Sequence, residues 1–121
     1  MIIISNIIFA IALALLFTHE MDAVRRQEWK MFVILKDMSD EKAYRIFTLL
    51  HIPLYALFFL LWLFDYLLAL FYLLDIFLIL HLFIHIGFSK HSGNNLKNRI
   101  SKGIIISAGL LAFIHLIIIS I

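Results

Sequence analysis

Residues 46–88 read IFTLLHIPLYALFFLLWLFDYLLALFYLLDIFLILHLFIHIGF. This stretch contains no Lys or Arg, and its only acids are Asp65 and Asp75. As one helix it would be about 65 Å long at 1.5 Å per residue, roughly twice the 30 Å hydrocarbon core of a bilayer. The chain must therefore reverse near Asp65, and the stretch predicts two antiparallel membrane-spanning helices that meet in a tight turn.

Two further apolar stretches flank this pair, so that four helices are predicted, over about residues 2–24, 40–64, 66–89 and 96–121. The 121-residue chain is 64% hydrophobic, and its mean hydropathy of +1.07 lies well outside the range of soluble domains. We therefore expect an all-α fold, an integral membrane four-helix bundle that forms a single transmembrane domain over residues 1–121.

The basic residues indicate how the helices are oriented. Six of the ten Lys and Arg lie between residues 25 and 45, and the other four lie between residues 90 and 102. The positive-inside rule places both regions in the cytoplasm. We therefore expect a multi-pass protein of the inner (plasma) membrane with both termini non-cytoplasmic. The expected partners are anionic lipid headgroups at the cytoplasmic face and no nucleic acid; the pattern is also compatible with a homo-oligomer.

The connection between the first two predicted helices has a pattern of its own. Over about residues 25–38, Trp29, Phe32 and Val33 recur at helical spacing among basic residues, which predicts a short amphipathic segment in the membrane interface. Ser39, followed by two acids, predicts the N-cap of the second helix.

The last predicted helix carries small residues at four-residue spacing. Gly103 with Ser107, and Ala108 with Ala112, predict a face on which neighbouring helices approach closely. His115 continues the second of these stripes, so its side chain is expected to point into the bundle.

Ionisable residues recur inside the apolar stretches, where each costs at least a few kcal/mol and requires a partner, a cavity or a function. Every predicted helix contains at least one histidine. Counted at 1.5 Å per residue from the nearest basic residue, His19, His51 and His85 are all roughly 8 to 9 Å deep. His81 lies on the same helical face as His85, a spacing at which two imidazoles can bind one metal ion.

These depths predict a metal site in which the histidines of different helices converge. The chain has no cysteine, which excludes thiolate ligands, whereas imidazoles with carboxylates suit Zn or Fe. The alternative is that each histidine forms a structural hydrogen bond between helices. The expected groups are the metal ligands His19, His51, His81 and His85, and the catalytic or additional ligand carboxylates Glu20 and Asp22.

A second polar pair is expected deeper in the membrane. Asp75 and His115 lie at nearly equal distances from the basic residues on two antiparallel helices. The pair is interpreted either as a structural hydrogen bond, which lowers the cost of burying both groups, or as a step in a proton relay.

One run in the first half of the chain supports a resemblance. The pattern His19-Glu20-x-Asp22-Ala23, continued by Glu28-Trp29, resembles a family of small, functionally uncharacterised bacterial four-helix integral membrane proteins. The resemblance implies the architecture and carries no activity, substrate or site residue.

Three classes of function follow from these patterns. The first is a metal-dependent membrane enzyme, with Zn or Fe, that acts on a lipid-like substrate reaching the site sideways from the bilayer. The second is a non-enzymatic membrane scaffold or assembly protein. The third is a haem-binding electron carrier with axial histidines from facing helices.

Overall fold

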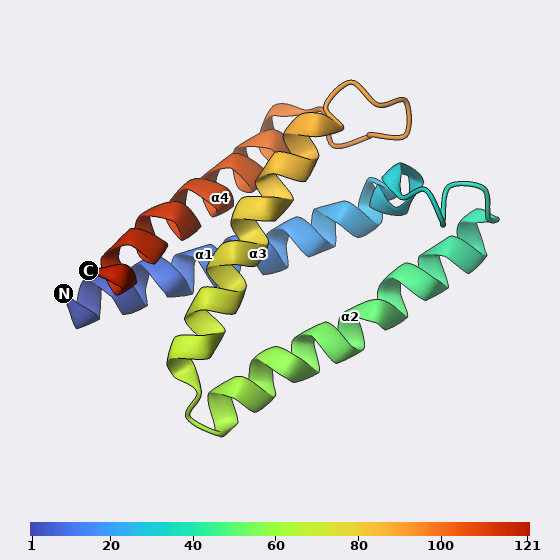
Figure 1. Cartoon of the computed structure of the whole chain (residues 1–121). Helices are drawn as coiled ribbons and strands as arrows, with labels where there is room; N and C mark the ends of the chain where they lie inside the picture. The colour runs from blue at the N-terminus through green and yellow to red at the C-terminus, as the bar shows by residue number, and fades with distance from the viewer.

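A computed structural model describes residues 1–121, and it contains four long helices and no strand (Figure 1). The elements are α1 (Ile2–Arg25), the 3-10 turn η1 (Glu28–Met31), α2 (Asp40–Leu63), α3 (Leu67–Gly87) and α4 (Arg99–Ser120). All four α-helices are long and apolar enough to cross a membrane. The structure thus confirms the all-α, four-helix membrane fold predicted from hydropathy.

The reversal between α2 and α3 is built without glycine or proline. Asp65 adopts a left-handed backbone conformation with φ of 59°, which Asp tolerates better than most residues. The Tyr66 N–H donates to the Leu61 carbonyl at 2.8 Å, and the Asp65 N–H donates to the Trp62 carbonyl at 3.1 Å. These two bonds form a Schellman motif, which ends α2 and turns the chain into α3.

The closest packing lies between α1 and α4, which run side by side in opposite directions. Apart from Glu20 and Gly109, their buried residues recur at alternating spacings of three and four, as in an antiparallel coiled coil. On α1 these residues are Ser5, Phe9, Ala12, Leu16, His19 and Ala23. On α4 they are Ser101, Ile105, Ala108, Ala112 and His115.

The structure confirms only part of the small-residue face that the sequence predicts for α4. Ala108 and Ala112 are buried, as predicted, but Gly103 and Ser107 are exposed on the opposite side of the helix. The additional close contact is made by Gly109, where a Cβ atom would lie 2.5 Å from Cδ2 of Leu82 on α3. Because α4 packs against both α1 and α3, it needs small residues on two adjacent faces.

Helix α2 stands apart from α1 and meets the bundle mainly at its two ends (Figure 1). At one end it joins α3 through the Asp65 turn. At the other end, Ala43 and Phe47 pack against Trp29 and Leu35 from the connection between α1 and α2. The standoff leaves a groove between α1 and α2 that is lined by aromatic side chains of both helices.

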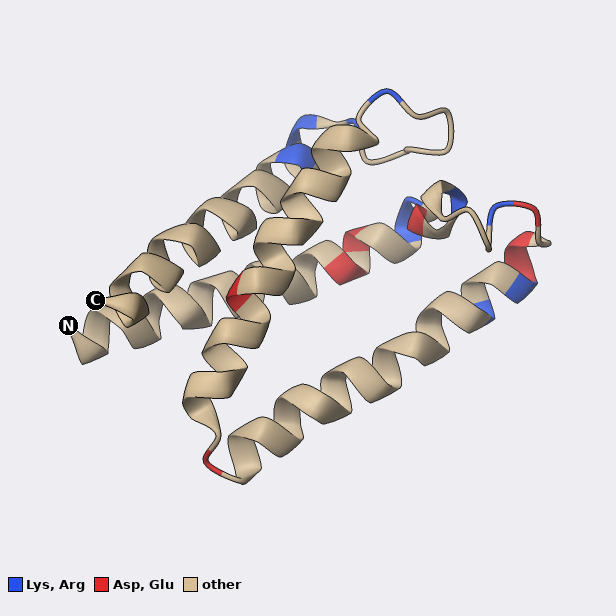
Figure 2. Cartoon of the chain, viewed as in Figure 1, with Lys and Arg blue, Asp and Glu red and all other residues tan.

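The connection between α1 and α2 is not a continuous amphipathic helix. Only η1 is helical, and the following residues form turns before Ser39 caps α2 by accepting a hydrogen bond from the Lys42 N–H at 3.4 Å. Trp29 is buried whereas Phe32 and Val33 are exposed, so the expected apolar face is divided. All Lys and Arg gather at this end of the bundle and Asp65 lies alone at the other (Figure 2); we refer to the first as the basic end.

The α1–α4 contact can be tested with two substitutions that add the same volume to α4. We expect Ala112→Leu to destabilise the protein by about 1 to 3 kcal/mol, because Ala112 is 0% exposed and close packing cannot absorb a larger side chain. Ser107→Leu, on the exposed face, should leave stability nearly unchanged. Thermal unfolding in detergent measures both, and equal losses would contradict the assignment of the packed face.

Candidate metal centre

A left-handed turn after α1 returns the chain to the bundle. Gln27 has φ of 54°, a conformation that costs a residue other than glycine roughly 1 to 2 kcal/mol. The turn directs Glu28 back between the helices, where its side chain is only 3% exposed. Strain of this kind is kept where the surrounding contacts enforce it, and here the enforcing contacts are the imidazoles that surround Glu28.

Four side chains converge at this position, namely His19 of α1, Glu28 of η1, and His81 and His85 of α3. Each offers a ligand atom, and these atoms all lie within 4.8 Å of one another. The Nε2 atoms of His81 and His19 are 2.8 Å apart. From Glu28, one oxygen lies 3.1 Å from His85 Nε2 and the other 3.3 Å from His19 Nε2. We call this group the His₃Glu cluster.

Glu28 supplies the negative charge of the His₃Glu cluster. Burial by itself would raise the pKa of the Glu28 carboxyl. Hydrogen bonds from His19 and His85, together with the charges of His19 and His81, outweigh burial and hold this pKa well below its usual range. Glu28 is therefore an ionised acceptor, and His85 donates its Nε2–H to it.

The His₃Glu cluster fits a small divalent metal ion. Ligand atoms 2.0 to 2.2 Å from a tetrahedral ion lie roughly 3.3 to 3.6 Å apart, which falls inside the range that the cluster spans, from 2.8 Å between His19 and His81 to at most 4.8 Å. Three imidazoles and one carboxylate are a donor set that suits Zn or Fe. One common feature is missing, because the second ring nitrogen of His19 is buried without the hydrogen-bond acceptor that usually orients a metal-binding histidine.

His51, expected among the ligands, lies outside the His₃Glu cluster. Its Nδ1–H donates to the Phe47 carbonyl at 2.7 Å, and its Nε2 is hydrogen-bonded to Glu20 Oε2 at 2.7 Å. Both ring nitrogens are thus engaged. The physical reason is the standoff of α2, which places His51 against the groove side of α1 rather than against α3.

The two carboxylates expected to be catalytic lie on different sides of α1. Glu20 faces the α1–α2 groove with His51. Asp22 faces α4, where it accepts a short hydrogen bond from the Ser101 hydroxyl and lies 3.6 Å from the Arg26 Nε. Asp22 therefore ties α1 to α4 and is absent from the His₃Glu cluster.

Asp75 and His115 form the expected pair and have a third partner. His115 Nδ1 lies 2.7 Å from Asp75 Oδ2, and its Nε2 lies 2.9 Å from the Ser5 Oγ of α1. Asp75 and His115 are both 0% exposed, so this network lies inside the bundle. Because Ser5 follows Met1 by four residues and His115 precedes Ile121 by six, the network lies near the end that carries the termini.

Two of these residues, Glu28 and Ser5, were not predicted as site residues from the sequence, although a pattern in the sequence marks each of them. Glu28 is an acid among residues that become buried, Trp29 and Met31, and it sits where the first helix must already have ended. Ser5 lies on the alternating stripe that contains His19. A heptad reading of the first helix would have placed both Ser5 and His19 on the buried face.

The model of a family of unknown function (DUF6713) matches residues 5–121. No curated protein and no solved structure matches the chain.

The role of Glu28 in holding the three imidazoles can be tested in metal-free protein. We expect Glu28→Gln to destabilise the bundle by about 1 to 3 kcal/mol, because an amide NH₂ would face an imidazole N–H and leave a buried donor unpaired. Glu41→Gln, which alters an exposed glutamate paired with Arg45, is the control and should not change the melting temperature. Thermal unfolding with a chelator present measures both variants; equal melting temperatures would mean that Glu28 does not hold the cluster.

Proposed function

We propose that this chain, which belongs to the DUF6713 family of unknown function, is a metal-dependent membrane enzyme that acts on a lipid-like substrate. The observation that carries the proposal is the convergence of His19, Glu28, His81 and His85 within 4.8 Å of one another inside a membrane-spanning bundle. Buried groups of this kind are expensive in a bilayer and mark functional sites more often than surface groups do.

The identity of the metal determines whether the His₃Glu cluster leaves a coordination position open for a substrate. Four protein ligands complete a tetrahedral zinc shell, as in structural sites. The same four ligands leave two positions of an octahedral iron ion for substrate or water. An enzyme is therefore favoured by iron, or by zinc from which one protein ligand is released.

The groove between α1 and α2 supports a substrate of lipid type. Its part near the basic end is lined by Phe17, Met21, Tyr55 and the Glu20–His51 pair. Glu20 directly follows the cluster residue His19 in the chain, so a molecule in the groove would meet an acid–base pair on the same turn of α1 that carries a cluster ligand. A carboxylate hydrogen-bonded to an imidazole is a common general acid–base arrangement.

The location proposed is the inner membrane, with the basic end in the cytoplasm and both termini outside. The support is the gathering of all Lys and Arg at that end (Figure 2). Anionic headgroups of the cytoplasmic leaflet are the proposed partners of these residues, and they would surround the mouth of the groove.

A scaffold function is the second candidate, and one observation favours it. His19, Glu28 and His85 are each less than 10% exposed, so a closed zinc site could simply fasten η1 and α3 to α1. A haem carrier is less well supported, because the four ligand atoms converge on one point instead of flanking a flat macrocycle.

The proposal predicts that protein purified in detergent carries about one metal ion per chain. His81→Ala and His85→Ala should lose most of this metal, because each removes a ligand. His51→Ala and His91→Ala are the matched controls and should retain it, since neither residue belongs to the cluster. Elemental analysis measures all four variants; a metal-free native protein that also fails to take up added Zn or Fe would refute the site.

The enzyme and scaffold functions are distinguished by comparing the lipids of cells that produce the native protein with those of cells that produce the His85→Ala variant. An enzyme should change the abundance of at least one lipid, and Glu20→Gln should abolish this change while the metal is retained. Stoichiometric zinc with identical lipid profiles would favour the scaffold.

The orientation has its own test. Reporters fused to either terminus should register outside the cytoplasm, and a cysteine introduced in place of Ser92 should be labelled only from inside, because the loops with the basic residues are retained in the cytoplasm. A terminus that reports from the cytoplasm would contradict the proposed orientation.

A further inference from the structure

The Ser5–His115–Asp75 network has the connectivity of a nucleophilic triad. The Asp75 carboxylate contacts one ring nitrogen of His115 at 2.7 Å, and the other ring nitrogen contacts the Ser5 hydroxyl at 2.9 Å. In the tautomer with the proton on Nδ1, His115 donates to Asp75 and accepts the Ser5 proton at Nε2. A buried carboxylate that fixes this tautomer lets histidine act as a base towards serine.

A structural hydrogen-bond chain does not account for every atom of this network. The Oδ1 atom of Asp75 is buried without a partner, although such atoms are normally satisfied. Ser5 and His115 alone would suffice to tie α1 to α4. Burying an additional carboxylate with one unpaired oxygen costs stability, and the charge of an imidazolium formed during a reaction would offset that cost.

An apolar cavity, which is part of the groove between α1 and α2, is separated from the network by the rings of Phe9 and Phe71. It has a volume of about 320 Å³ and is lined by twelve residues, eleven of them hydrophobic. Its wall includes Phe9 and Phe71, whose rings also contact the His115 ring with centroids 5.5 and 5.0 Å away. The network is thus one aromatic layer from a space that suits an acyl chain.

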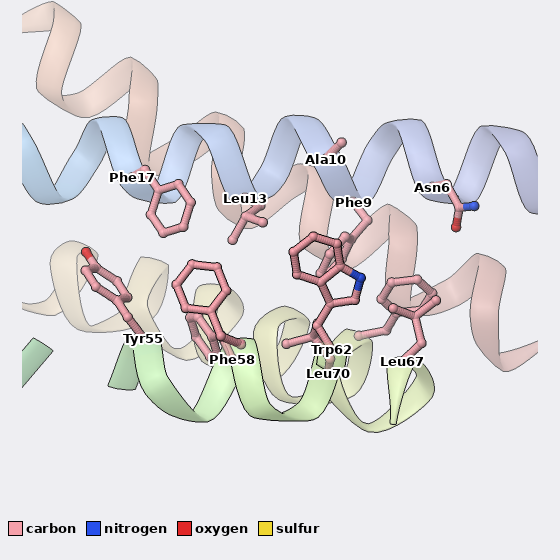
Figure 3. Close-up of a pocket in the computed structure, with 12 residues that line it drawn as sticks. Asn6, Phe9, Ala10, Leu13, Phe17, Tyr55, Phe58, Trp62, Leu67 and Leu70 are labelled. Carbon is pink, nitrogen blue, oxygen red and sulfur yellow. The ribbon is translucent and has the colours of Figure 1, made fainter. Parts of the chain in front are cut away.

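The polar end of this cavity is formed by the residue that follows Ser5 in the chain. Asn6, which follows Ser5 in the chain, is the single non-hydrophobic residue of the wall. Figure 3 shows its side chain at one end of the cavity, directed from α1 toward the segment that carries Leu67, like those of Phe9 and Phe17. The amide of Asn6 is the side-chain donor available at this end of the cavity for a developing oxyanion.

From these observations we propose that Ser5 is an activated nucleophile that cleaves a fatty-acyl ester whose chain occupies the cavity. Ser5 Oγ attacks the ester carbonyl carbon as its proton passes to His115 Nε2. The bond to the alcohol oxygen then breaks, and the alcohol leaves with the proton from His115. Water attacks the acyl-serine in the same way and releases the fatty acid, so that the reaction needs no oxidant or reductant. Asp75 is a positioning residue, because it acts through His115.

The test uses full-length protein in detergent and a long-chain alkyl fluorophosphonate, which reacts with activated serines. Mass spectrometry of the native protein should locate the adduct on Ser5, a result that requires no variant. The long-chain probe should react faster than a short-chain one, because only the former fills the cavity. A folded protein that remains unlabelled, or an adduct on another residue, would overturn the proposal.

Variants of the network then distinguish an activated Ser5 from a Ser5 that only forms a structural hydrogen bond. Ser5→Ala should abolish labelling, and His115→Gln should lower its rate about 100-fold or more, as expected for loss of a general base. Asp75→Asn should lower the maximal rate without changing the probe concentration at half-maximal rate. Ser120→Ala is the matched control, because the Ser120 hydroxyl bonds only the Leu116 carbonyl; its labelling should be unchanged.

The result does not depend on the metal centre. Each variant is checked for cooperative unfolding, which reports folding independently of Ser5 labelling. If an altered chain fails to fold, the adduct position in native protein still decides. A labelled Ser5 in metal-free protein would support this activity even if the metal proposal failed.

Discussion

A polar side chain in hydrocarbon must be paired, and in this protein the partner usually comes from another helix. His51 of α2 bonds Glu20 of α1, and His115 of α4 bonds both Asp75 of α3 and Ser5 of α1. Each bond fixes the rotation and register of two helices, because a slip by one residue would leave both partners buried and unpaired. The rest of the bundle depends on this constraint, since the apolar faces alone could slide past one another.

The polar residues form two groups at different depths. On α1, Ser5 and His19 are separated by about four turns, roughly 21 Å along the helix axis at 1.5 Å per residue. Between them lie Phe9, Ala12 and Leu16, packed with α3 and α4 in the largest apolar core. An apolar core of this length keeps the two groups chemically separate, so that each can be altered without disturbing the other.

Side-chain size explains why one side of the bundle is closed and the other is open. Alanines and Gly109 let α4 approach its neighbours closely. Across the α1–α2 gap, by contrast, aromatic rings such as Phe17 and Tyr55 meet edge to face at a centroid distance of 5.5 Å, which holds the backbones apart. The gap runs past the Glu20–His51 pair at one end and Asn6 at the other.

The sequence by itself determined the number of helices, the reversal at Asp65, the gathering of charge at one end and the position of each histidine along its helix. These features follow from length and hydrophobicity, which the bilayer converts directly into structure. Equal distances from the basic residues also predicted that His19 lies near His81 and His85, and that Asp75 lies near His115. The tertiary structure alone decided the partners around each helix. His51 lies outside the cluster because α2 stands apart from α1, and the rotation of α4 about its axis exposes Gly103 and Ser107. The left-handed turn at Gln27 places Glu28 in the cluster. Hydropathy fixes how deep a side chain lies, whereas the direction in which it points depends on how the helices pack.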